Sequence, residues 1–206
     1  MLHRPGYYQL ALSYNKESQV TYGLILAMTD KGQELSRLQE SLESMRMYCE
    51  QPLILAALTA ELVVDSCSAK IELVDGDLNT IEEESGLHGY NNRRRGNPLG
   101  MDFFNAIQVL HFANRTLGLD TIRLEFVIHS LTRITNETKR LSVQERVVPR
   151  ELGRTGTPIL VSDGRIITEE LVDYLESLCK NQLLRAKFQE NRIQTQLTVV
   201  SYPVHK

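Results

Sequence analysis

The sequence predicts a mainly α-helical chain with a small N-terminal β-hairpin, an α+β protein whose helices form a bundle ending in a long, stalk-like C-terminal helix. Residues 7–28 are rich in β-branched and aromatic residues, which favours strands. From residue 35 onward apolar residues recur every three or four positions, the spacing of one face of a helix. No strong helix breaker lies between Thr168 and Pro203, so the last helix is expected to be long.

Composition sets the first limits on function. With 206 residues, 42% of them hydrophobic and 24% charged, the chain is long and apolar enough for a packed core, unlike a disordered or collagen-like chain. A net charge of −3 and the absence of Trp offer nothing for phosphates or stacked bases, so we expect no nucleic acid partner. The longest plainly apolar run, residues 53–58, is too short to span a membrane.

Three cysteines, Cys49, Cys67 and Cys179, lie far apart, and their odd number does not suggest a disulfide framework. The N-terminus also lacks the apolar segment of a signal peptide. We therefore expect reduced thiols and an intracellular, cytoplasmic location, with no membrane insertion by this chain itself.

The N-terminal residues are expected to form two strands. Residues 7–14 alternate loosely between apolar and polar, and residues 20–28 are apolar and rich in β-branched and aromatic side chains. The polar residues 15–19 between them suit a hairpin loop. Because a lone hairpin is only marginally stable in water, it must pack on another element.

Two helices are expected next. The first carries an apolar stripe formed by Leu35, Leu38, Leu42, Met45 and Cys49. Pro52 suits the first turn of the second helix, where its missing N–H costs nothing. The apolar positions of that second helix are Leu55, Leu58, Leu62, Ala69 and Leu73, continuing towards Ile81. A loop is predicted at residues 85–100.

A further pair of helices is expected in the middle of the chain. Gly118 suits the C-terminal end of the first, whose apolar positions begin at Phe103. Asp120 suits the N-cap of the second, which runs through Leu124 to Leu141. A second loop is predicted at residues 148–164, and Thr168 is a plausible cap for the final helix. We accordingly divide the chain into residues 1–165, holding hairpin and bundle, and residues 166–206, holding the long helix.

The final helix is expected to pack only in part. Its apolar stripe ends after Leu178 and gives way to Gln182, Arg185 and Gln189. Apolar residues then return at a narrow spacing, as Ile193, Leu197 and Val200. A stripe of this kind joins helices together, so we predict self-association through the C-terminal helix, with residues beyond Gln189 dispensable for folding. The alternative is that the stripe docks on its own domain.

Motifs of known chemistry are few. The segment Asp75-Gly-Asp77-Leu-Asn79 begins like a calcium-binding EF-hand loop, but Thr80 and Gly86 stand where that loop needs glycine and glutamate. No nucleophile, P-loop or dinucleotide-binding motif occurs, which favours a non-enzymatic protein without deciding the question. The alternative is a helical-bundle enzyme or small-molecule binder, with a pocket between helices lined by Phe103, Phe104, His111, Phe126 and His129.

Several segments together resemble the cytoplasmic region of fungal CorA-like proteins, which are related to CorA-type magnesium transporters. The segment QPLILAALTAE at residues 51–61 is similar to an apolar motif of that group. The segment QTQLTVV at residues 194–200 is similar to the end of its stalk helix before the membrane. The chain lacks the two membrane helices and the Gly-Met-Asn motif of the transporters, so no pore residue and no transport activity carry over.

The resemblance implies a non-enzymatic domain that senses a divalent cation or oligomerises, and that lies close to a membrane if it belongs to a longer transporter. The residues themselves indicate no cofactor, and the resemblance alone allows Mg²⁺. Acidic side chains would repel one another until a cation bridges them. By charge, the metal candidates are Asp75, Asp77 and Glu82, in an acidic run that continues to Glu84.

Overall fold

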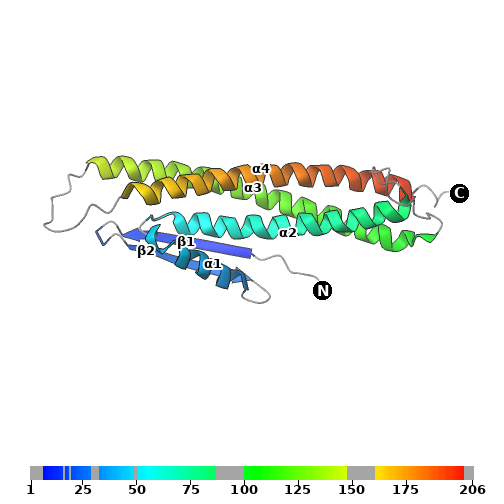
Figure 1. Cartoon of the computed structure of the whole chain (residues 1–206), viewed down its shortest axis with the longest axis horizontal. Coiled ribbons are helices and arrows are strands. Elements are labelled where there is room, and N and C mark those ends of the chain that lie inside the picture. Colours follow the sequence, from blue (N-terminus) through cyan, green and yellow to red (C-terminus); the bar gives the residue numbers. More distant parts are fainter. Residues whose placement is uncertain are drawn as a thin grey trace. The chain divides into compact units, whose positions relative to one another are not determined.

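The computed structural model describes residues 7–15, 17–18, 20–28, 33–48, 51–86, 100–147 and 161–201. Within these residues, a two-stranded antiparallel sheet precedes four α-helices and one short 3-10 helix (Figure 1). The elements are β1 Tyr7–Asn15, β2 Val20–Met28, α1 Gln33–Ser44, η1 Arg46–Tyr48, α2 Ile54–Ser85, α3 Phe103–Val147 and α4 Val161–Ser201. The predicted fold class, mainly α with an N-terminal hairpin, is confirmed.

The chain forms two compact units. The first comprises Met1–Asp65 and Phe126–Leu178, and the second comprises Ser66–Glu125 and Cys179–Lys206. Each of the helices α2, α3 and α4 therefore contributes one segment to each unit. The domain boundary expected between residues 165 and 166 lies inside α4, shortly after this helix begins.

In the first unit the hairpin has the strands expected from its composition. The register pairs Leu10 with Ile25 and Leu12 with Gly23. The turn is held by Asn15, whose Oδ1 accepts hydrogen bonds from the N–H groups of Glu17 and Ser18. A Cβ at Gly23 would overlap the side chain of Leu55, so glycine here admits α2 closely to the sheet.

The core of the first unit forms where α1 meets the start of α2. Four side chains, Leu38, Ile54, Leu58 and Leu62, are buried together. Partly buried apolar residues pack around them from β2, α1, α2 and α4, namely Ile25, Leu42, Leu55 and Leu171. The hairpin is thus not alone in water, as its marginal stability requires.

Helix α2 is a continuous helix of 32 residues. It begins at Ile54, two residues after Pro52, and ends at Ser85, because Gly86 adopts a left-handed φ of 71°. The predicted apolar stripe is wrong in its second half. Ala69 and Leu73 are exposed, and the buried line instead runs through Ile71 and Leu78.

Helix α3 is one continuous helix of 45 residues, so the predicted break at Gly118 and Asp120 is wrong. Gly118 sits mid-helix with open space around it. A glycine there costs about 1 kcal/mol relative to alanine, too little to end a helix whose apolar face continues on both sides. Asp120 does not cap a helix, because it lies within α3, and it is only 1% exposed.

Helix α4 also begins earlier than its sequence suggested. It starts at Val161, and Thr168 lies within it, donating its hydroxyl to the carbonyl of Gly164 at 2.8 Å. Thr168 therefore does not cap the helix. With 41 residues at 1.5 Å each, α4 is about 60 Å long.

The buried positions of the three long helices alternate at spacings of three and four, the pattern of a coiled coil. In α2 they are Val64, Cys67, Ile71, Val74, Leu78 and Ile81. In α3 they are Leu110, Ala113, Leu117, Asp120, Leu124, Val127, Leu131 and Ile134. In α4 they are Val172, Leu175, Cys179, Gln182, Ala186, Gln189, Ile193 and Gln196.

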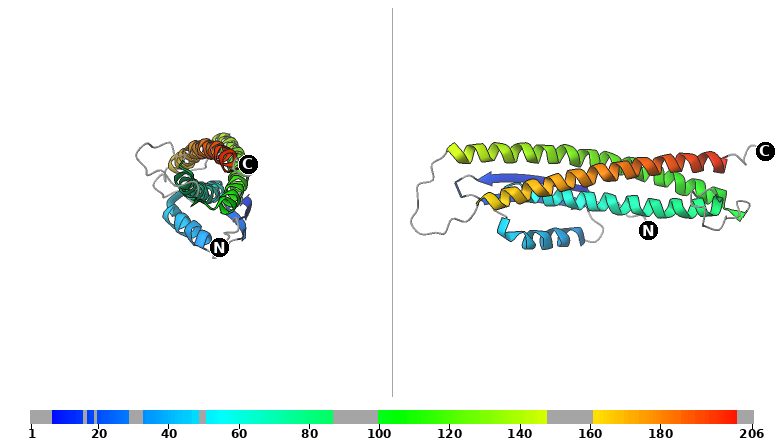
Figure 2. Two further views of the ribbon diagram at one scale, coloured as in Figure 1. Left: turned by 90° about the vertical axis from the view of Figure 1, so that its right-hand side faces the viewer. Right: turned by 45° about the horizontal axis from the view of Figure 1, so that its top comes forward.

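Within the second unit, α2 and α4 run in the same direction and α3 runs opposite to them (Figures 1 and 2). The contacts agree, since Ile71 meets Gln189 and Ser85 meets Gln196 further along both helices.

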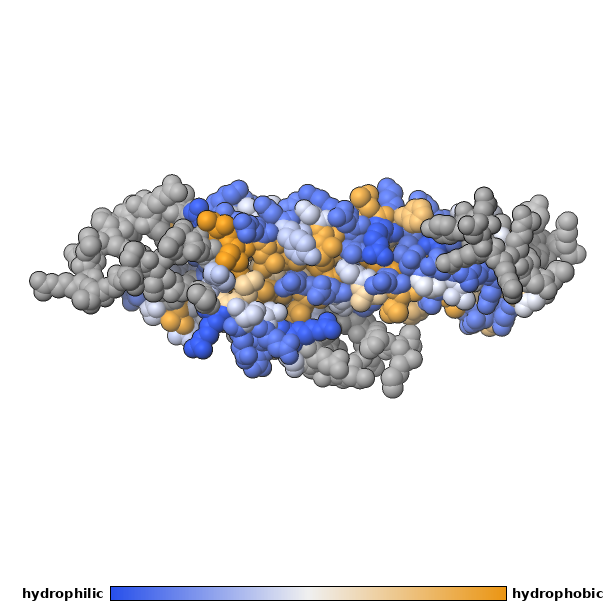
Figure 3. Space-filling model, in the orientation of Figure 1, coloured by the Kyte–Doolittle hydropathy of each residue, from blue (hydrophilic) through white to orange (hydrophobic). Residues whose placement is uncertain are grey.

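On the face drawn in Figure 3, apolar side chains reach the surface among hydrophilic ones. Among the described residues, no helix is both long and apolar enough to cross a membrane.

Some expectations lie outside the described residues. Cys49, most of the loop expected at residues 85–100 and most of the loop expected at residues 148–164 belong to this group. The last residues of the latter, from Val161, are helical.

Candidate functional site

The densest group of polar contacts surrounds Arg192 of α4 in the second unit. Its Nε and Nη2 donate to the two carboxylate oxygens of Glu82, each at 2.8 Å. Nη2 also donates to Oδ1 of Asn79 at 2.7 Å, and Nη1 pairs with the carboxylate of Asp75. A planar guanidinium bound to a carboxylate at two points, with two further acceptors, is a strong and orienting arrangement.

The helix geometry explains why these groups meet. Asp75, Asn79 and Glu82 are spaced by four and three residues, so they share one face of α2. Arg192 precedes the buried Ile193 and therefore flanks the core seam of α4. In parallel paired helices, residues flanking the seam on one helix reach those flanking it on the other.

Electrostatics strengthen the cluster. The pKa of Arg192 is raised, chiefly by its hydrogen bonds to Glu82 and further by the charges of Glu82 and Asp75, which together exceed the opposing effect of burial. The guanidinium also lies 5.9 Å from the centre of the Phe188 ring, within range of a cation–π contact. The side chains of Arg192 and Glu82 are only 16% and 12% exposed, so solvent screens this pair weakly.

Two of the three metal candidates belong to this cluster. Asp75 and Glu82 are brought together, but by Arg192, whose positive charge stands where the sequence suggested a bridging cation. Asp77 is exposed, and no contact with the cluster joins it. Among the described residues, no group of three or more His, Cys, Asp or Glu side chains is arranged to hold a metal ion.

A second buried polar group surrounds Asp120 of α3. Nη1 of Arg123 donates to its Oδ1 at 2.9 Å, and Nζ of Lys70 lies 3.7 Å from the same oxygen. The thiol of Cys67 donates to this oxygen at 3.7 Å. Burial, followed by the charge of Asp120, raises the pKa of Cys67 to about 12, so this thiol stays protonated and unreactive at neutral pH.

The buried glutamines of α4 show that the prediction of a final helix that packs only in part is wrong. Gln182 and Gln189 are buried, while Arg185 is exposed. Gln189 donates its amide to the carbonyl of Ile71 at 3.1 Å, and Oε1 of Gln196 accepts the hydroxyl of Ser85 at 3.1 Å. The buried glutamines are core residues of the second unit, two of them, Gln189 and Gln196, bonded to α2, and they do not mark the end of packing.

The apolar return after Gln189 also has its partners within the monomer. Ile193 is fully buried in the second unit, and Leu197 is half-buried. The side chain of Val200 lies outside the described residues. The alternative reading, that this stripe docks on its own domain, therefore describes Ile193 correctly.

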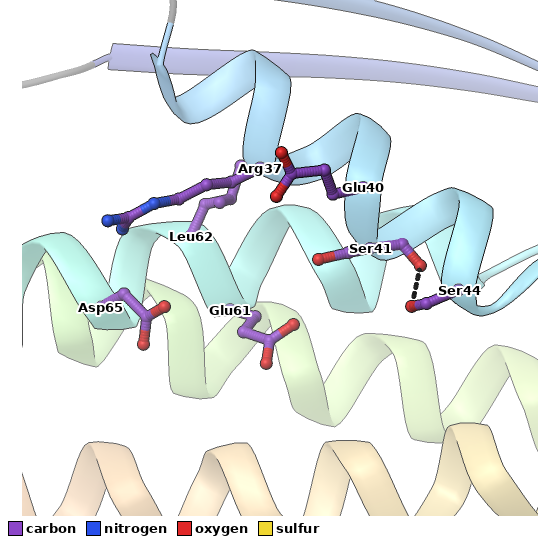
Figure 4. Close-up of a pocket in the computed structure, with 7 residues that line it drawn as sticks. All are labelled: Arg37, Glu40, Ser41, Ser44, Glu61, Leu62 and Asp65. Atoms are coloured by element: carbon purple, nitrogen blue, oxygen red, sulfur yellow. Dashed lines mark hydrogen bonds between the residues drawn. The ribbon is translucent and has the colours of Figure 1, made fainter.

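A shallow pocket of about 450 Å³ opens between α1 and α2 in the first unit (Figure 4). Its lining is mostly polar and consists of Arg37, Glu40, Ser41, Ser44, Glu61, Leu62 and Asp65. Glu61 and Asp65 both extend from α2. Burial raises the pKa of Glu61, and the nearby charge of Asp65 raises it further.

This raised pKa predicts a pH-dependent stability. Because the folded protein holds the proton of Glu61 more tightly than the unfolded chain, Glu61 favours folding at low pH, and that contribution is lost as the pH rises through its folded pKa. We expect Glu61→Gln to raise the melting temperature at neutral pH, with the difference disappearing under acidic conditions. Thermal unfolding followed by circular dichroism across this pH range measures it. Glu40→Gln, in the same pocket, is the matched control, and a variant less stable than the wild type at neutral pH contradicts the prediction.

Most of the residues suggested for the alternative pocket are exposed. His111, Phe126 and His129 are exposed on α3, and Phe104 is exposed as well. Phe103 is only half-buried. Core positions of α3 face inward at spacings of three and four, which turns these residues towards solvent.

Arg192 is the residue that sequence reasoning missed. In the sequence it is one of several basic residues in the later turns of the last helix, where positive charge suits the helix dipole. A usable signal was present, since Arg192 stands next to an apolar core position and Asp75 and Glu82 lie seven residues apart. Recognising the heptads of α2 and α4 would have put both carboxylates and the arginine beside the same seam.

The fold and the Arg192 cluster define an α-helical domain of coiled-coil type, with an N-terminal hairpin packed at one of its units. Comparison of the chain with models of protein families, with curated proteins and with solved structures gave no match.

Proposed function

We propose that this chain is a non-enzymatic helical domain similar to the cytoplasmic domain of CorA-like divalent-cation transporters. The order of its elements supports this proposal, since a hairpin and a short helix precede three long helices. The two segments that resemble the family lie at the start of α2 and near the end of α4. The polar side chains that come together are bound to one another in ion pairs, which suits a mechanical role better than catalysis.

The observation that carries the proposal is the Arg192 cluster. In this domain the guanidinium performs internally the bridging that a divalent cation would perform between Asp75 and Glu82. It thereby holds the C-terminal part of α4 on α2 as a fixed stalk. Mg²⁺ is then not required at these carboxylates in the wild-type chain.

We expect Arg192→Gln to make the protein both less stable and responsive to Mg²⁺. Removing one partner leaves Glu82 poorly solvated beside Asp75, at a cost of about 2–3 kcal/mol for this partly buried cluster. For a chain of this size the melting temperature falls by about 5–10 °C. Millimolar MgCl₂ should restore part of that loss in the variant, compared with NaCl of the same ionic strength, and should leave the wild type unchanged. Thermal unfolding by circular dichroism measures all four conditions.

Arg185→Gln is the matched control, because Arg185 lies one heptad earlier on α4 and is exposed. A wild-type chain that Mg²⁺ stabilises more than NaCl would mean that the carboxylates take the cation themselves, against an internal bridge.

The family part of the proposal has a separate test. Residues 1–201 joined to the membrane helices of a CorA-type transporter should support Mg²⁺ uptake in cells that lack their own transporters. A folded, membrane-inserted chimera without uptake contradicts it.

A further inference from the structure

Helix α3 carries an exposed apolar surface in the second unit. Phe104 is 72% exposed, Phe112 54%, Leu119 42% and Ile122 64%. At 100° per residue, these four positions fall within about 80° of the helix circumference. We call this group the α3 stripe. It extends over 19 residues, or roughly 27 Å.

The stripe is large enough to serve as a binding surface. Its exposed side chains amount to roughly 400–500 Å² of apolar area, within the range of the largest patch on a typical protein, which is often functional. The core of the unit does not need these residues, because the inward positions of α3 are already filled by Leu110, Leu117 and Leu124.

The charges of the stripe restrict what binds there. Arg115 lies near its centre, exposed and with no hydrogen bond or ion pair among the described residues. Between Phe104 and Ile122 the one acidic residue is Asp120, which is buried and bound by Arg123. The exposed part of this surface therefore offers a cation and no carboxylate.

We propose that the α3 stripe binds an amphipathic helix of a partner protein, with apolar residues at spacings of three and four and a carboxylate opposite Arg115. This is the helix-in-groove mode of recognition, in which an apolar face supplies affinity and a charge fixes the register. The proposal is independent of the proposed function, since no residue of the stripe belongs to the Arg192 cluster.

A second copy of this chain fits less well. Pairing α3 with itself across a two-fold axis at the centre of the stripe brings the two Arg115 residues within about one helical turn of each other, and in-register parallel pairing opposes them directly. The stripe also supplies roughly half of the 800 Å² per partner that stable complexes of folded surfaces bury. A single helix can bury the remaining area by also contacting the polar residues on both sides of the stripe.

The test uses two synthetic helical peptides of about six turns. Both have leucine along one face; one places glutamate opposite Arg115 and the other places lysine there. Fluorescence anisotropy with the full chain should show binding of the glutamate peptide, weakened about tenfold by Arg115→Glu. The lysine peptide should bind Arg115→Glu better than the wild type. This exchange of preference does not depend on the absolute affinity.

Phe112→Asp should abolish binding of the glutamate peptide while circular dichroism shows an unchanged fold. Leu73→Asp is the matched control, because Leu73 is 65% exposed on α2, outside the stripe, and its variant should bind normally. Equal binding of both peptides by the wild type would overturn the proposal. So would a dimer in sedimentation, or binding to phosphatidylserine vesicles, that Phe112→Asp removes, because a second copy or a lipid surface would then be the occupant.

Discussion

Ending the chain at Gln189 is expected to unfold the second unit. The truncation removes Arg192, Ile193 and Gln196, which bond to or pack within that unit. Losing a fully buried isoleucine alone costs about 2–5 kcal/mol, and leaving Glu82 without its partner adds to this. The sum approaches the whole stability of an ordinary domain, about 5–15 kcal/mol.

Hydrogen exchange measured by mass spectrometry resolves the effect along the chain. Amides of residues 66–85 and 103–125 should exchange rapidly in the truncated protein, whereas a chain ending at Ser201 should keep its protection. The opposite result, an unchanged melting temperature with the loss of a dimer, would restore the first expectation from the sequence. That expectation was that the apolar residues beyond Gln189 serve self-association.

Leu58→Ala should be among the most damaging single substitutions in the first unit. Leu58 is 2% exposed and packs with Leu38, Ile54 and Leu62 in the core between α1 and α2. The variant loses the transfer free energy of the removed atoms and leaves a cavity, for a cost of about 2–5 kcal/mol. Chemical denaturation followed by circular dichroism should show a lower midpoint with an unchanged slope.

Leu73→Ala is the control for this substitution. It changes the same residue type on the same helix, but Leu73 is 65% exposed, so its free energy of unfolding should change by less than about 0.5 kcal/mol. Similar losses at both positions would show that burial does not decide the loss, since alanine is the better helix former of the two residues. An unchanged midpoint for Leu58→Ala would contradict the placement of Leu58 in the core.

The errors made from sequence share one cause. Gly118 and Asp120 are residue types that often end and begin helices, and both lie within α3. Leu110, Leu117, Leu124 and Leu131 continue at a spacing of seven across them, so packing outweighs local preference. In α4, glutamine is a residue type that is usually exposed, yet Gln182 and Gln189 are buried, and the amide of Gln189 donates to the backbone of α2.

The Arg192 cluster was beyond local analysis for a related reason. Asp75 and Glu82 lie more than a hundred residues from Arg192 along the chain. A metal was expected at these carboxylates from their charge alone, because a sequence does not show whether an acidic side chain has a positive partner. Only the parallel packing of α2 and α4 supplies the positive partner.

The sequence by itself determined the type and order of the elements, because strand and helix preferences are set by the spacing of apolar side chains over a few neighbouring residues. It placed the hairpin, the buried start of α2 and the long final helix near their observed positions. Tertiary structure alone decided where α3 continues, that Gln182 and Gln189 are core residues, and that Arg192 bridges Asp75 and Glu82. These outcomes depend on contacts between distant segments, whose free energies of burial and ion pairing exceed the local preferences that a sequence displays.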